Sequence, residues 1–144
     1  MNRLRVTRGQ LKTMSSHLGT DAASQALGSN IQALQAKLDA LEGELIQVKL
    51  GSSEGTLRFP TMLNEQLNGF RNVIEADAAP TRAQLELYTA FSKRLEAQLV
   101  LWRGLLEKDI PALNQQILSG NLKLIDPNAT AGSGAGAGSG GKRR

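Results

Sequence analysis

Residues 80–118, PTRAQLELYTAFSKRLEAQLVLWRGLLEKDIPALNQQIL, contain a long and regular apolar pattern. Large apolar side chains recur there at steps of three and four residues. They are Tyr88, Phe91, Leu95, Leu99, Trp102, Leu106, Ile110, Leu113 and Ile117. This spacing places them on one stripe of an α-helix. A stripe of this length needs cover, so we expect the preceding residues to supply helices that pack against it.

A second stripe runs through Leu27, Ile31, Leu34, Leu38, Leu41, Leu45 and Val48, at alternating steps of four and three. This is a heptad seam, and it predicts a helix over about 21–50. Gly28 and Gly43 each lower helix propensity by about 1 kcal/mol, so packing must stabilise this helix. The partner is either another copy in a parallel coiled coil or the second long stripe of the same chain. The intramolecular arrangement costs less entropy.

A third, shorter helix is expected over 60–75, where Leu63, Leu67, Phe70 and Ile74 repeat at helical spacing. Pro80 then suits a helix entry, and Thr81 with Gln84 has the spacing of a capping box. These signals predict a long helix over 80–119. Pro111 is expected to kink this helix rather than to end it, because the apolar stripe continues beyond the proline.

The two ends of the chain differ from the middle. In residues 1–19 the apolar side chains keep no clean period, which predicts a basic, weakly ordered arm, either frayed or weakly helical. Residues 121–144 begin with an apolar turn and continue as a Gly/Ala/Ser-rich segment, for which we expect a flexible tail. The prediction is therefore an all-α, antiparallel three-helix bundle (long, short, long) over 20–120, with a kink near Pro111.

One set of side chains is expected to form the bundle core or an interface. Its members are Leu34, Leu38, Leu41, Leu45, Leu63, Leu67, Phe70, Tyr88, Phe91, Leu95, Leu99, Trp102 and Leu106. Trp102 lies on the long stripe, which favours a packing role over contact with a ligand. Arg82 with Glu86, and Arg103 with Glu107, are expected to form ion pairs one helical turn apart.

The composition and charge of the chain argue against several kinds of metal, membrane and nucleic-acid-binding site. The 144 residues include no cysteine, so disulfides and thiolate metal sites are excluded, and the single His17 excludes a multi-histidine site within one chain. No run of eighteen apolar residues predicts a transmembrane helix, and the N-terminus lacks the apolar stretch of a secretion signal. The net charge is +4, but residues 20–125 carry 10 basic and 12 acidic residues, net −2. No basic face for specific nucleic-acid binding is therefore indicated.

Three short patterns could carry chemistry, and each lacks the context that its chemistry needs. Gly-rich residues 132–141, followed by Lys142, lack the strand, helix and hydroxyl residue of a phosphate-binding loop. The carboxylates of Glu75 and Asp77 have no third ligand or base nearby. The pattern at 128–130 fits N-glycosylation but is short enough to occur by chance. We therefore predict no catalytic residue, no cofactor and no metal site.

Three segments together resemble a known family. They are LRFPTMLNEQLNGF (57–70), ADAAPT (76–81) and RLEAQLVLWRGLLEKDIPALN (94–114). They are similar to the helical C-terminal region of bacterial sortilin-like β-propeller proteins, a glycosyl-hydrolase-like group with BNR-type repeats. The resemblance covers about residues 30–120. It implies a helical domain that follows a propeller in a protein that is usually exported. No blade repeat and no catalytic residue of the family maps onto this sequence.

Three functions remain open from the sequence. The first is a non-catalytic helical accessory or interaction domain, a C-terminal piece of a sortilin-like propeller protein whose protein partner is that propeller or a second copy. The second is a free-standing coiled-coil adaptor that self-associates through the Leu27–Val48 seam. The third is a fragment of an enzyme whose chemistry lies elsewhere, so that a hydrolase assay on this chain should give nothing.

Overall fold

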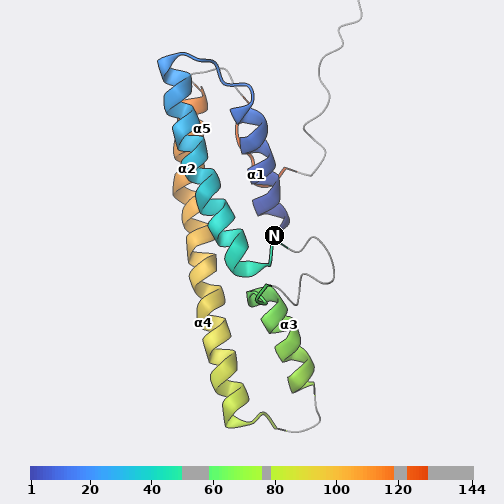
Figure 1. Ribbon diagram of the computed structural model, residues 1–144. Coiled ribbons are helices and arrows are strands. Elements are labelled where there is room, and N and C mark those ends of the chain that lie inside the picture. Colours follow the sequence, from blue (N-terminus) through green and yellow to red (C-terminus); the bar gives the residue numbers. More distant parts are fainter. Residues whose placement is uncertain (50–58, 76–78, 119–122, 130–144) are drawn as a thin grey trace, which may run out of the picture.

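The structure is a computed structural model that describes residues 1–49, 59–75, 79–118 and 123–129. All regular structure in these residues is helical, so the all-α prediction is confirmed. The elements are α1 (Asn2–Ser15), α2 (Ala22–Leu45), α3 (Leu63–Ile74), α4 (Arg82–Gly104), the π-helical turn η2 (Leu105–Asp109) and α5 (Ile110–Leu118). α4, η2 and α5 follow one another directly and form one long rod (Figure 1).

Two helices begin with side-chain caps, and the sequence predicts the second of them. The Asp21 carboxylate accepts a hydrogen bond from the Ser24 amide at 3.1 Å at the start of α2. At the start of α4 the Gln84 amide donates to the Thr81 hydroxyl at 3.3 Å, while the Thr81 amide donates to the Gln84 side chain at 2.7 Å. This reciprocal pair is the predicted capping box, and it is confirmed.

Helices α1, α2 and α5 enclose the main core, and we call this part of the molecule the closed half. Thirteen buried apolar residues meet there: Leu4, Leu11, Met14, Leu27, Ile31, Leu34, Leu38, Leu41, Leu105, Ile110, Leu113, Ile117 and Ile125. Leu18, Leu45, Trp102 and Leu106 are partly buried against this cluster. The seam is therefore covered within the chain from Leu27 to Leu41, whereas Leu45 is partly buried and Val48, beyond the end of α2, is 57% exposed.

Helix α1 differs from the weakly ordered arm expected for residues 1–19. It is a helix of 14 residues that packs on α2 and buries Leu4, Thr7, Leu11 and Met14. These positions are three or four residues apart, so they form one stripe. Thr7 hides the pattern in the sequence because it is polar. Its hydroxyl is satisfied by the Arg3 carbonyl at 2.9 Å, so it can be fully buried.

Charged side chains also join α1 to α2. The Glu42 carboxylate is 1% exposed, and its two oxygens accept from Arg5 Nε at 2.8 Å and from Arg8 Nη1. The same Arg8 nitrogen donates to Asp39 at 3.0 Å. Two of the basic residues assigned to the arm therefore neutralise a buried carboxylate on the neighbouring helix.

The residues after α5 return to the closed half. Ile125 is 3% exposed, and its backbone makes two hydrogen bonds with the Asn114 side chain, at 2.8 and 2.9 Å. The Gln10 side chain makes two more with the backbone of Asp126, at 2.9 and 3.0 Å. Residues 125 and 126 thus bridge α5 and α1, while the start of the apolar turn expected from residue 121 lies outside the described residues.

The π turn η2 lies directly before Pro111, the second residue of α5. Proline has no amide hydrogen to complete an α-helical turn, and a π turn is a local way to change the hydrogen-bond pattern. The helix continues past Pro111, as the apolar stripe indicates. The predicted kink is not confirmed.

Helices α3 and α4 form the other half of the molecule, which we call the open half. They pack on each other, and both contact α2. In Figure 1, α1 lies beside the upper part of the α4–α5 rod and α3 beside the lower part. A three-helix bundle is therefore not confirmed, because the described residues contain a fourth packed helix and divide it between two halves.

Candidate interaction surface

Helix α4 has 23 residues, and none of them is buried. It nevertheless carries many large apolar side chains. Leu85, Tyr88, Val100 and Leu101 are between 55% and 57% exposed, and Leu87 is 44% exposed. Apolar side chains scattered singly on a surface are normal, but several on one helix make that helix a candidate interaction surface.

One turn of α4, Leu99-Val100-Leu101-Trp102, consists entirely of large apolar residues. Four consecutive residues point about 100° apart, so together they cover the whole circumference of the helix. Leu99, Val100 and Leu101 are all exposed, and Trp102 is partly buried against the core. A helix that is apolar on all sides is typical of a buried environment. Residues 99–102 of α4 therefore have the composition of a buried helix, although three of these four side chains are exposed.

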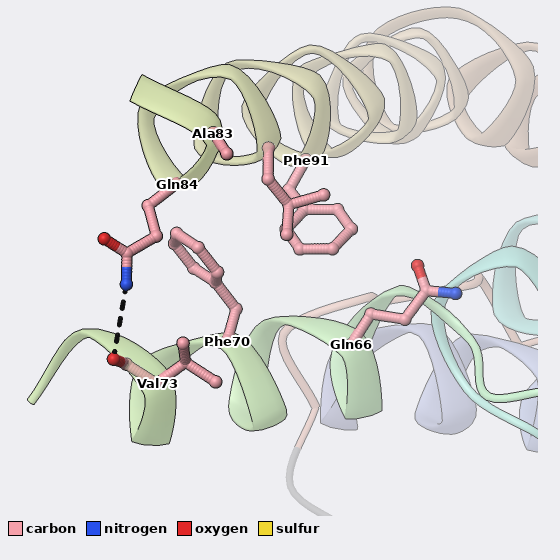
Figure 2. Close-up of a pocket in the computed structure, with 7 residues that line it drawn as sticks. Gln66, Phe70, Val73, Ala83, Gln84 and Phe91 are labelled. Carbon is pink, nitrogen blue, oxygen red and sulfur yellow. Dashed lines mark hydrogen bonds between the residues drawn. The ribbon is translucent and has the colours of Figure 1, made fainter. Parts of the chain in front are cut away.

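The contact between α3 and α4 centres on two aromatic rings. Phe70 is 8% exposed, and its ring meets the ring of Phe91 edge to face, with centroids 5.8 Å apart. Figure 2 shows the two rings between the helices, with Gln84 reaching across to the Val73 carbonyl at 3.4 Å. This aromatic contact holds the open half together.

A shallow hollow of about 340 Å³ lies beside these rings. It is lined by Gln66, Phe70, Val73, Ala83, Gln84, Leu87 and Phe91, of which Figure 2 labels six. Its walls are mostly apolar, and no charged side chain lines it. The hollow can accept an apolar side chain of a partner, and it contains no group for acid–base or nucleophilic chemistry.

A second hollow, of about 560 Å³, lies where the two halves meet. Its lining comes from the start of α1, the end of α2 and the middle of α4, including Leu45, Leu95, Leu99 and Trp102. The side-chain amide oxygen Oε1 of Gln98 also lies here, buried and without a hydrogen-bond partner among the described residues. This hollow explains why Trp102, expected in the core or at an interface, is only partly buried.

The surface of α4 carries two of the predicted ion pairs, with different outcomes. Arg82 pairs with Glu86 at 2.8 Å, as expected one turn apart. Arg103 does not pair with Glu107. It donates to Glu96 at 3.2 Å, two turns back along the helix. Both side chains of this pair are more than half exposed, so the attraction is weak in water.

The predicted packing residues fall into three groups in the structure. Leu34, Leu38, Leu41, Leu63 and Phe70 are buried. Leu45, Leu67, Phe91, Leu95, Trp102 and Leu106 are partly buried. Tyr88 and Leu99 are exposed, at 57% and 38%. Leu4, Leu11 and Met14 are absent from the prediction, although their spacing with Thr7 is a usable helical signal.

Of the residues weighed for chemistry, Glu75 and His17 belong to the described part of the chain, and both are exposed. Glu75 is exposed and pairs with Arg71 at 2.7 Å, while Asp77 and residues 132–142 lie outside the described residues. His17 is exposed, with its ring nitrogen 2.7 Å from the Thr13 carbonyl. The described ranges contain no cluster of three or more His, Asp or Glu side chains that could bind a metal ion. None of the described helices is long and apolar enough to cross a membrane.

No family model, curated protein or solved structure matches this chain. The sortilin-like resemblance therefore rests on the three sequence segments alone. Two of them include described residues of α3 and of the α4–α5 rod. The functional argument has to come from the exposed apolar surface of these helices.

Proposed function

We propose that this chain is a non-catalytic helical interaction module whose open half binds another protein. One observation carries the proposal: α4 is 23 residues long, rich in large apolar side chains, and buries none of them. The closed half supplies a stable base, since none of the thirteen buried apolar residues of its core comes from α3 or α4. A partner would cover apolar side chains that now face water, and that burial is the main source of affinity in protein association.

Two kinds of partner are compatible with this surface. The sortilin-like resemblance names a propeller domain, and its three segments include the helices that expose the apolar surface. The other partner is a second copy of the chain. Self-association through the Leu27–Val48 seam has little support, because Ile31 and Leu38 on that seam are fully buried in the closed half.

Site-specific photo-crosslinking in the cells that make the protein tests the proposal. A photoreactive amino acid is placed at Leu87 or Leu101 on α4, and in control chains at the exposed Ala33 or Ala36 on α2. We expect discrete crosslinked products from the α4 positions and none from the α2 positions. Equal crosslinking from both helices, or none from α4, contradicts the proposal. Mass spectrometry of the products identifies the partner.

A further inference from the structure

The outward face of α4 carries charges in a self-complementary order. Along α4 this face presents Lys93, Glu96, Leu99, Val100 and Arg103, and it continues onto the π turn η2 with Glu107. All six side chains are exposed. Successive members are three or four residues apart, apart from the central pair of neighbours, so they share one side of the helix. The order is plus, minus, two apolar residues, plus, minus.

When a second copy of the helix runs in the opposite direction, each charge in this order lies opposite a charge of the other sign. If a second α4 lies antiparallel with a two-fold axis near Val100, Lys93 faces Glu107 of the second copy and Glu96 faces its Arg103. Each pair occurs twice because of the symmetry. A parallel, in-register arrangement instead sets each charge against a like charge, which is unfavourable. The charge pattern therefore favours a second copy of this helix in the antiparallel orientation.

The charged side chains of this face can pair with a second copy without breaking a buried contact. Lys93 and Glu107 form no ion pair within the part of the chain that the structure describes. Arg103 and Glu96 reach each other over two helical turns at 3.2 Å, with side chains 58% and 59% exposed. At an antiparallel crossing the same two groups meet a second Arg103 and a second Glu96, so an exposed pair becomes a cluster of four charges.

The apolar centre of the face supplies the contact between the charges. Val100 is 55% exposed, and Leu99, which lies at the edge of the face and also lines the second hollow, is 38% exposed. At the two-fold axis, Leu99 of one copy lies against Val100 of the other, and both lose contact with water. The face is small, so the expected association is of the weak, reversible kind.

We propose that a second copy of this chain binds antiparallel along α4, with Leu99 and Val100 at the two-fold axis and Glu96 paired with Arg103 of the second copy. This rests on the proposed function, because it names the partner for one face of the same helix. It differs from the adaptor expected from the sequence, whose seam lies on α2.

The first test measures mass by sedimentation equilibrium of the full chain from about 1 µM to about 1 mM, the range expected for a small interface. We expect a reversible monomer–dimer equilibrium. Val100→Glu should weaken it at least tenfold, because two new carboxylates meet at the axis. Ala36→Glu is the control: it adds the same charge at an exposed position of α2, outside this face. A monomer at all concentrations, or equal loss in both variants, overturns the proposal.

A charge exchange tests the pairing itself. Glu96→Arg and Arg103→Glu should each prevent self-association, because each leaves like charges opposite one another. Mixed in equal amounts, the two variants should form a heterodimer, since opposite charges then face each other at both sites. Failure of the mixture to associate, when the wild-type chain does, overturns the assigned pairing.

Single cysteines test the direction, since the chain has none of its own. Val100→Cys should crosslink to its own counterpart on mild oxidation, because it lies at the axis. Thr89→Cys should not, because its counterpart is about 33 Å away at 1.5 Å per residue. Crosslinking at both positions indicates a parallel pair and overturns the antiparallel one. If the chain is a monomer but α4 crosslinks to a different protein in cells, this inference fails and the proposed function stands.

Discussion

The Arg5 guanidinium donates to the Glu42 carboxylate at 2.8 Å and connects α1 to α2. Glu42 is 1% exposed, whereas the Arg5 side chain is 56% exposed, so the buried charge depends on a partner that reaches in from the surface. Arg8 contributes the second contact. These contacts turn a basic N-terminal stretch into a packed helix.

Replacing both arginines with alanine should destabilise the protein. Arg5→Ala with Arg8→Ala leaves the Glu42 charge buried and unpaired. Breaking a fully buried pair costs about 3–5 kcal/mol, and we expect about 2–3 kcal/mol here because the arginines are partly exposed. Urea unfolding followed by circular dichroism measures the loss. Lys12→Ala, also on α1, is the control and should change stability by less than about 0.5 kcal/mol.

Leu11→Ala tests whether α1 belongs to the core. Leu11 is completely buried among side chains of the closed half, so its truncation should cost about 2–5 kcal/mol. Ser15→Ala, at an exposed position of the same helix, should leave the urea midpoint almost unchanged. A Leu11→Ala midpoint equal to that of wild type would show that residues 1–19 are the loosely attached arm expected from sequence.

Phe70→Ala should loosen the open half without unfolding the closed half. It removes the edge-to-face contact with Phe91 and the ring that is most buried between α3 and α4. The expected cost is about 3 kcal/mol, at the lower end for a buried phenylalanine, because only two helices surround it. Hydrogen exchange should show faster exchange in α3 and unchanged protection in α1. Val73→Ala is the control, since Val73 is 61% exposed. Equal loss of protection in α1 would mean that the two halves unfold together.

The cap of α2 should make stability depend on acid pH. Hydrogen bonds from the Ser24 hydroxyl and amide lower the pKa of Asp21 below its ordinary value of 3.8. A lowered pKa in the folded state means that the stabilising contribution is present above pH 3.8 and is lost as the pH falls through the folded-state value. In urea titrations at several pH values, Asp21→Asn should remove this part of the pH dependence while keeping a capping oxygen. An unchanged acid profile in Asp21→Asn would assign the dependence to other carboxylates.

Local signals in the sequence predicted the helices of the middle of the chain well. The predicted Thr81 cap begins α4, and the stripe from Leu27 to Leu41 is buried as its spacing indicates. These features depend on residues three or four positions apart, so the helical period alone reveals them. The same argument missed α1, because Thr7 interrupts the apolar pattern and its burial depends on a hydrogen bond to Arg3.

Tertiary structure decided which apolar stripes are buried by other helices and which remain exposed. The sequence by itself determined the helices and their apolar stripes, since propensity, caps and periodicity are local properties. It could not determine that Leu11 and Ile117 meet in one core while Tyr88 and Leu99, on an equally regular stripe, remain exposed. That choice depends on contacts between residues distant in sequence, which place α1 over one end of the α4–α5 rod and leave the outward face of α4 uncovered.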